Sequence, residues 1–362
     1  MRDQDSWRTF LLVLLSALFM LFTPSGSAEV PDADRYVETY KQYLDAVSPL
    51  PEDEIKHFVF IPRAEIREHS FLDNERIAGA QILYPWRALE KSRGSYDFSI
   101  VSEDLDYLTS RKKKLFIQLQ DVTFHFESPA VPSYLRSPEF DGGEFEKKSD
   151  EGASSGWIAK RWNSRVRDRF ALLLKALGKE FDGKVEGINL PETAAEGLST
   201  ERDSSFTSQL YAEGIKANMR ALKGAFPKSV TIQYANFMPG EWLPWEDRRY
   251  LRSIYEYGEE IGVGLGGPDL MVRRKAQLNH ALALMHENRY SVPLSIAVQR
   301  GNYIGMTGAD VGPGQSLPKG NHQQPTDVPM LHAFARDFLR VDYIFWQNEE
   351  PYFTRDVLSH LR

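Results

Sequence analysis

The chain has 362 residues, a formal net charge of −7 at pH 7 and no cysteine. The acidic balance argues against a nucleic-acid partner, because phosphate binding needs a basic surface. The lack of cysteine excludes disulfides, thiol nucleophiles and thiolate metal sites, so stability must come from burial. The 21 Phe, 16 Tyr and 7 Trp suit a large core, and they also suit sugar binding, since aromatic rings stack on sugar faces.

The first 28 residues have the order of a secretory signal peptide. Arg2 and Arg8 precede an apolar run at 10–22, and Pro24 and small residues follow up to Ala28. The run is short for a membrane span, which needs roughly 20 apolar residues. We therefore predict a signal peptide at 1–28, one mature domain at 29–362 and a secreted or periplasmic protein, with an uncleaved N-terminal anchor as the alternative.

Apolar runs of β type alternate with helical stretches through the rest of the chain. After a polar, helical lead-in at 31–46, candidate strands lie at 56–65, 79–86, 114–121, 185–192, 230–237, 262–269, 292–299 and 341–350. Apolar residues at helical spacing lie between them at 98–111, 164–181, 204–225, 247–261, 271–288 and 328–340. Eight such units predict a single-domain (β/α)8 TIM barrel of the α/β class with long βα loops, and an eight-stranded open sheet is the alternative. The interval 66–78 is short for a full helix.

Two inserts interrupt this alternation. Residues 137–160 are polar and rich in Gly and Ser, and they follow the third strand. Residues 300–327 are rich in Gly and Pro, and they follow the seventh strand. Loops of this length inside a compact domain are usually lids, binding loops or disordered segments. We expect both inserts to shape the specificity of the site.

The ends of the candidate strands carry many polar and aromatic side chains. In a (β/α)8 barrel the chemistry gathers at the C-terminal ends of the strands. Amides bind sugar hydroxyls there, and aromatic rings stack on sugars. The predicted substrate-binding residues are Tyr84, Trp86, Arg87, Gln120, Asp121, Asn189, Tyr234, Asn236, Gln299, Trp346 and Asn348. We therefore expect a carbohydrate substrate, with no metal and no cofactor.

Glu192 follows the fourth strand in the stretch GINLPETAAEG, residues 187–197. Pro191 cannot donate to a sheet ladder, so the strand must end there and leave Glu192 at the rim. A carboxyl among apolar neighbours has a raised pKa, which suits the general acid that glycoside hydrolysis needs beside a second carboxylate. Capping of the next segment, or a pair with a nearby arginine, is the alternative role for Glu192.

The stretch YPWRALEKSRGSYDFS (84–99) resembles the second-strand segment of clan A glycoside hydrolases, especially bacterial beta-galactosidases. VPSYLRS (131–137) is similar to the turn after the third strand of that clan. The resemblance implies that Glu192 is the acid/base, although Leu190 and Pro191 separate it from Asn189 where the clan has an adjacent Asn-Glu pair. It also implies that Trp346 lies beneath the sugar in the first subsite. The matching positions are Trp86, Leu89, Glu90, Gly94, Tyr96, Asp97 and Phe98.

One position departs from the pattern of the clan. The clan has its nucleophile, a Glu, at the end of strand seven, where this chain has Gln299. An amide cannot replace that carboxylate. Asp269, Glu349 and Glu350 are the candidates for the second catalytic carboxylate. A relocated base favours inversion, because an inverting pair stands about 6.5–9.5 Å apart.

The sequence therefore predicts a secreted or periplasmic glycoside hydrolase of a poly- or oligosaccharide. A catalytically inactive carbohydrate-binding barrel, involved in polysaccharide export or surface assembly, is the alternative. A metal-dependent hydrolase is disfavoured, because the 8 histidines show no His-x-His or His-Glu-x-x-His spacing. The glycines of GVGLGGPD (262–269) are better explained by close backbone approach than by a nucleotide site, since no phosphate-cradling helix start follows.

Overall fold

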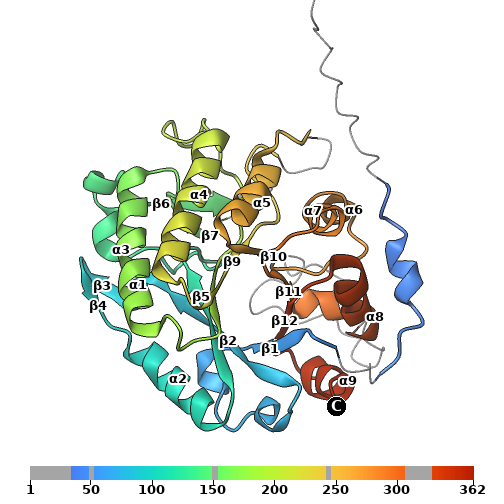
Figure 1. Cartoon of the computed structure of the whole chain (residues 1–362). Coiled ribbons are helices and arrows are strands. Elements are labelled where there is room, and N and C mark those ends of the chain that lie inside the picture. Colours follow the sequence, from blue (N-terminus) through green and yellow to red (C-terminus); the bar gives the residue numbers. More distant parts are fainter. Residues whose placement is uncertain (1–33, 49–52, 149–153, 242–245, 306–327) are drawn as a thin grey trace, which may run out of the picture. The chain divides into compact units, whose positions relative to one another are not determined.

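The computed structural model describes residues 34–48, 53–148, 154–241, 246–305 and 328–362. Within these ranges, parallel strands form a closed barrel in the order β1-β12-β11-β10-β9-β8-β5-β2 (Figure 1). The barrel strands are β1 (Lys56–Phe60), β2 (Ile77–Pro85), β5 (Lys114–Gln120), β8 (Gly187–Leu190), β9 (Val230–Tyr234), β10 (Gly264–Gly267), β11 (Leu294–Val298) and β12 (Tyr343–Gln347). The predicted (β/α)8 barrel is confirmed, each of these strands falls on a predicted one, and the open sheet is wrong.

Helices occupy most of the intervals between the strands. They are α1 (Trp86–Leu89), α2 (Ser99–Ser110), α3 (Ser164–Phe181), α4 (Ser208–Ala225), α5 (Tyr250–Ile261), α6 (Lys275–Leu278), α7 (Ala281–Glu287), α8 (Val328–Ala333) and α9 (Leu358–His360). The short interval after β1 holds 3-10 turns at Arg63–Glu65 and Ser70–Asp73. The predicted lead-in helix is reduced to a 3-10 turn at Thr39–Tyr43. Among the described residues no helix is long and apolar enough to cross a membrane.

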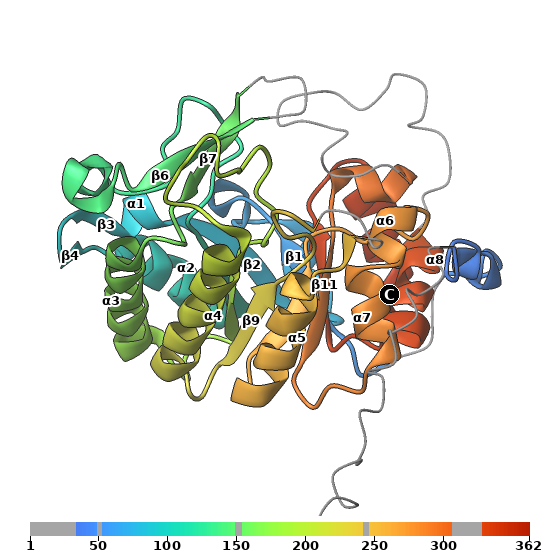
Figure 2. The same ribbon diagram turned by 90° about the horizontal axis from the view of Figure 1, so that it is seen from above.

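The insert after β5 is more ordered than its composition predicts. It forms an antiparallel hairpin of β6 (Glu144–Lys148) and β7 (Ser154–Ala159), beyond the end of the barrel where β5 stops (Figure 2). A smaller sheet pairs β3 (Glu90–Ser92) with β4 (Ser95–Tyr96). The insert after β11 begins with a 3-10 turn at Arg300–Ile304, and 306–327 lie outside the described residues, as does the predicted signal peptide.

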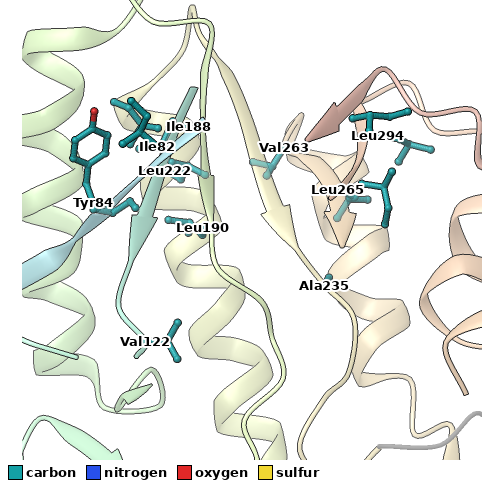
Figure 3. Packing of buried hydrophobic residues seen from close by; sticks show 14 of the residues in the cluster. Ile82, Tyr84, Val122, Ile188, Leu190, Leu222, Ala235, Val263, Leu265 and Leu294 are labelled. Carbon is teal, nitrogen blue, oxygen red and sulfur yellow. The ribbon is translucent and has the colours of Figure 1, made fainter. Parts of the chain in front are cut away.

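Apolar side chains fill the layer between the strands and the helices. Ile82 of β2, Ile188 of β8 and Leu222 of α4 belong to this outer core (Figure 3). The predicted apolar face of α3 is buried as expected, and Asn163 caps that helix by accepting from the backbone N–H groups of Arg165 and Val166. A separate inner core fills the barrel itself, and it consists of Phe58, Phe116, Ile232, Tyr234, Ala297, Tyr343 and Phe345.

The glycines of β10 are explained by close packing against β11. A Cβ atom on Gly266 would lie 2.1 Å from Oγ and 2.6 Å from the carbonyl oxygen of Ser295. A Cβ atom on Gly264 would lie 2.7 Å from the carbonyl oxygen of Pro293. Both distances are shorter than a Cβ atom can adopt, so only glycine allows β11 to approach β10 this closely.

Candidate active site

Glu192 lies at the C-terminal end of β8, two residues after the strand ends at Leu190. Its Oε2 accepts a hydrogen bond of 2.6 Å from Nδ2 of Asn236, which follows β9. The other side of the Asn236 amide accepts from the backbone N–H of Ala194, and the backbone N–H of Asn236 donates to Thr193 Oγ1. The ends of two adjacent strands therefore hold the Glu192 carboxyl from one side.

A buried ion pair fixes the backbone at Glu192. Arg161 donates from Nη2 and Nε to the two oxygens of Asp121, at 2.6 and 2.8 Å. The same guanidinium donates from Nη1 to the carbonyl oxygen of Glu192 at 2.8 Å and to Tyr211 Oη at 2.9 Å. Tyr211 in turn donates to the carbonyl oxygen of Thr193. Asp121, predicted to bind substrate, is thus committed to Arg161 and positions Glu192.

Asp269, two residues beyond the end of β10, is one of two carboxylates whose negative charge raises the pKa of Glu192, and Glu196 is the other. Its Oδ1 accepts from Nδ2 of Asn302 at 3.1 Å. Oδ1 of Asn302 accepts from the backbone N–H groups of Gln299 and Leu270, at 2.7 and 3.2 Å. Gln299, at the position where the clan has its nucleophile, instead caps the 3-10 turn that carries Asn302.

The surroundings raise the pKa of the Glu192 carboxyl. Burial is the largest cause, and the negative charges of Asp269 and Glu196 act in the same direction. The Lys147 ammonium and the hydrogen bond from Asn236 oppose this shift, because both favour the ionised form. A carboxyl with a raised pKa keeps its proton nearer to neutral pH, which is what a general acid requires.

Amide side chains form the floor beneath this rim. Nε2 of Gln81 donates both to Oδ1 of Asn189 and to Tyr234 Oη, each at 3.0 Å. Gln118 and Gln120 alternate with the inner-core residue Phe116 along β5, so they also face the barrel axis. Oε1 of Gln118 is buried and has no hydrogen-bond partner among the described residues. Such an acceptor is costly unless a ligand hydroxyl satisfies it.

Three of the predicted sugar-stacking residues face away from the barrel axis, so the prediction is wrong for them. Tyr84 donates to Oδ2 of Asp104 on α2 at 2.8 Å. Trp86 is 0% exposed and donates to Oε2 of Glu90 at 2.8 Å. Trp346 is also 0% exposed and donates to Nδ1 of His57 at 3.1 Å. These side chains lie in the outer core, so they cannot lie under a sugar.

The remaining predicted residues are spread around the rim. Glu349 pairs with Arg300, whose Nε lies 3.0 Å from Oε1. Glu350 is exposed and accepts from Thr354 Oγ1. Asn348 bonds His69 and Glu65, which follow β1. Arg87 donates to the carbonyl oxygen of Pro129. Of the three candidates for the second carboxylate, the structure brings Asp269 into the electrostatic surroundings of Glu192.

Sequence reasoning missed Asn302 and Lys147, which lie in the two inserts. Neither residue belongs to a recognisable motif. Contacts between segments that are far apart in the sequence bring both of them to the site. Gln118 had a weak signal, because a polar residue at every second position of an otherwise apolar strand predicts one polar face.

A histidine cluster lies outside the barrel, against β1 and β12. The carboxylate of Asp53 stands 2.7 Å from Nε2 of His332 and 3.6 Å from Nε2 of His57. His332 also contacts His360, which bonds Ser48. Two histidines and a carboxylate are a typical donor set for a divalent metal. However, Nδ1 of His57 accepts from the indole N–H of Trp346, so in the neutral ring the proton is on Nε2, which faces Asp53. We therefore interpret the cluster as a hydrogen-bonded network.

No family model and no curated protein matches the chain. Among solved structures it is similar to the catalytic domain of beta-amylase from Paenibacillus polymyxa, with a TM-score of 0.55 and 9% identity over 83% of this chain and 93% of that chain. It is also similar to a psychrophilic glycoside hydrolase family 10 endo-beta-1,4-xylanase, with a TM-score of 0.46 and 12% identity over 86% of this chain and 89% of that chain.

The chain has the (β/α)8 barrel fold that the sequence resemblance implied, and it shares this fold with the beta-amylase catalytic domain. At these identities the likeness establishes the fold, and the chemistry has to be argued from the side chains at the rim.

Proposed function

We propose that this protein is a glycoside hydrolase of an oligo- or polysaccharide, with Glu192 as the general acid. The observation that carries the proposal is the Glu192 carboxyl itself. It stands at the C-terminal end of a barrel strand, accepts a hydrogen bond from Asn236, and has a pKa raised by burial and by the charge of Asp269. This is the place and the environment of an acid that protonates a glycosidic oxygen.

Asp269 is the second carboxylate in this mechanism. Glu192 gives its proton to the leaving oxygen, and Asp269 either attacks the anomeric carbon or takes a proton from the attacking water. The hydrogen bond from Asn302 orients Asp269. The orphaned oxygen of Gln118 accepts from a sugar hydroxyl, and Gln120 lies on the same face of β5.

Reducing-end release from a panel of oligo- and polysaccharides tests the assignment. On a substrate that the wild type cleaves, we expect Glu192→Gln and Asp269→Asn each to lower kcat/KM about 100- to 10,000-fold. Glu213→Gln is the matched control, because Glu213 is exposed on α4 and bonds Gln209. Full activity of the Glu192 variant would overturn the proposal.

A parallel variant separates the candidates for the second carboxylate. Glu349 is neutralised by Arg300, so we expect Glu349→Gln to change kcat/KM by less than about fivefold, a loss of the size that a supporting contact gives. A large loss of kcat/KM in Glu349→Gln, together with an active Asp269→Asn, would identify Glu349 as the second catalytic carboxylate. NMR of the first-formed anomer then reports whether the pair inverts or retains.

A carbohydrate-binding barrel without catalysis is the second candidate function. It is favoured by Gln299, which stands at the clan's nucleophile position and serves as a cap for the turn that carries Asn302. Glycan-array binding by the wild type, with no reducing-end release from the bound glycans, would support this function over hydrolysis.

The cellular location of the protein is also part of the proposal. The predicted signal peptide at 1–28 supports a secreted or periplasmic enzyme. N-terminal sequencing of the protein purified from the producing cell tests this, with a start near Glu29 expected. A start at Met1 in a membrane fraction would favour the uncleaved anchor.

A further inference from the structure

Lys147 of β6 is a buried lysine for which the described residues offer no acceptor. Its side chain is only 4% exposed. Its Nζ lies 3.9 Å from the centroid of the Phe124 ring. In the described part of the chain the Lys147 ammonium makes no hydrogen bond and has no carboxylate within ion-pair distance. Lysines buried to this extent are usually paired, because an ammonium that loses much of its hydration needs a partner.

The hairpin that carries Lys147 is held firmly on both sides. Toward β5, the backbone N–H of Thr123 donates to the carbonyl oxygen of Trp157 at 2.7 Å. Toward the loop after β8, Arg202 donates to the carbonyl oxygen of Glu146 at 2.9 Å, and Ser155 Oγ donates to Glu196 at 3.3 Å. The hairpin thus packs against the loop that starts at Glu192, on the end of the barrel where the site lies (Figure 2).

The charges around Lys147 connect it with the candidate active site. Glu192 and Glu196 favour its charged form, while burial, the largest effect, and the Arg161 guanidinium lower its pKa. Arg161 is itself paired with Asp121. The Lys147 ammonium therefore lies within electrostatic reach of Glu192 and keeps its N–H donors for another acceptor.

A simple counter-ion role for Lys147 does not account for this arrangement. A counter-ion for Glu192 would stand within ion-pair distance, and the Glu192 carboxylate instead accepts from Asn236. What the ammonium lacks among the described residues is an acceptor, and a ligand group with several acceptor oxygens supplies one. A substrate carboxylate satisfies both the charge and the donors of a buried ammonium, whereas a neutral hydroxyl satisfies one donor at most.

We propose that Lys147 binds an acidic group of the substrate next to Glu192, so that the enzyme acts on a glycan that contains carboxylated sugars. This inference rests on the proposed function, since it names the substrate class of the same site. The β6–β7 hairpin is then the element that selects the substrate, and it does so through one lysine held at its inner edge.

The test uses matched glycan pairs that differ by oxidation of the C6 hydroxyl to a carboxylate. Binding is measured by glycan array and calorimetry on Glu192→Gln, which stops turnover, with and without Lys147→Met. We expect preferential binding of the carboxylated members. Lys147→Met should weaken that binding at least tenfold, the size of a lost charged hydrogen bond, and change binding of the neutral members less than about twofold. Lys147→Arg, which keeps the charge, should retain most of the preference.

The melting temperature separates a binding role from a structural one. Burial disfavours the charged form of Lys147, which has no carboxylate partner among the described residues. Lys147→Met should therefore melt at the same or a higher temperature than its parent. A lower melting temperature with equal weakening of both glycan sets would overturn the inference, as would a preference for neutral glycans that Lys147→Met leaves unchanged. If the wild type neither binds nor cleaves any member of either set, the proposed function itself fails, and the assignment of Lys147 fails with it.

Discussion

Asn236 donates from Nδ2 to Oε2 of Glu192 at 2.6 Å, across the ends of the neighbouring strands β8 and β9. This bond favours the ionised carboxylate and therefore opposes the burial that raises the Glu192 pKa. The hydrogen bond from Asn236 therefore lowers the pH at which Glu192 loses its proton.

Asn236→Ala should therefore move the alkaline limb of the kcat/KM profile to higher pH. Without the hydrogen bond the charged form of Glu192 loses a stabilising contact, so its pKa rises further. We expect a shift of about one pH unit, which corresponds to 1.36 kcal/mol. The measurement is the pH profile on one substrate at low concentration. An alkaline limb that stays in place, or moves to lower pH, would show that Glu192 is not the group that titrates there.

The buried pair of Arg161 and Asp121 should dominate the local stability. Arg161→Met leaves the Asp121 carboxylate buried and unpaired, so we expect a loss of about 3–5 kcal/mol in the free energy of unfolding. Urea denaturation measures it. Arg93→Met is the control, because Arg93 and Glu139 form an exposed pair worth roughly 1 kcal/mol or less.

Replacing both partners of that pair provides the internal check. Asp121→Leu combined with Arg161→Met removes the uncompensated charge and should recover part of the lost stability. A double variant whose loss equals the sum of the losses in Asp121→Leu and Arg161→Met would show that the two charges are not coupled, which would contradict the role of the ion pair.

The fold could be predicted from the sequence because its signals are local and repeated. Each barrel strand is a short apolar run, and the face of α3 that the spacing of Val166, Phe170 and Leu173 predicts is the buried one. Even the short interval after β1 could be foreseen, and it holds 3-10 turns where the other units have helices.

The faces of the strands were harder to predict. Successive side chains of a strand point to opposite sides, so an error of one residue turns a site residue into a core residue. In β2, Leu83 and Pro85 alternate with Tyr84 and lie on the same side of the strand as Gln81, which faces the barrel axis. Trp346 lies between the inward-facing Phe345 and Gln347 in the same way. An aromatic residue suits either face, and so its identity does not settle the phase.

The inserts hid the other functional residues for a different reason. Lys147 and Asn302 are positioned by tertiary contacts such as that of Arg202 with the hairpin and that of Asn302 with Asp269. Composition predicts a loop for such segments, and it carries no information about which of their side chains will lie at the site.

Acid should destabilise the protein through the histidine network. Burial is the main cause that lowers the pKa of His57 to about 4 and that of His360 to about 3, from the ordinary 6.5. The unfolded chain therefore binds more protons than the folded one between pH 6.5 and those values, and the free energy of unfolding falls as the pH is lowered through that window. Bonds of the Asp53 carboxylate to His332 and His57 lower its pKa against the effect of burial, which adds a loss of the same sign below about pH 4.

Melting temperatures between pH 7 and 4 measure this effect. His360→Gln removes one of the titrating groups and should flatten the fall, whereas His125→Gln, at an exposed position after β5, should leave it unchanged. A melting temperature that is constant from pH 6.5 to 4.5 would contradict the lowered pKa values of His57 and His360.

The glycines offer a matched pair of substitutions with opposite signs. Gly266→Ala places a methyl group 2.1 Å from Oγ and 2.6 Å from the carbonyl oxygen of Ser295. The side-chain oxygen can rotate away, but the backbone carbonyl belongs to β11 and cannot move without opening the barrel. Overpacking of this kind costs about 1–3 kcal/mol. Gly224→Ala lies in α4 and meets nothing within 4 Å, so it should stabilise the protein by about 0.5–1 kcal/mol through helix propensity.

Because both substitutions add the same methyl group, their difference in unfolding free energy isolates the contact between β10 and β11. That contact also sets the position of Asp269 at the end of β10, so Gly266→Ala should lower kcat/KM, and Gly224→Ala should leave it unchanged. If Gly266→Ala were as stable and as active as Gly224→Ala, the barrel would not be closed at β10 and β11 as described, and the placement of Asp269 near Glu192 would lose its support.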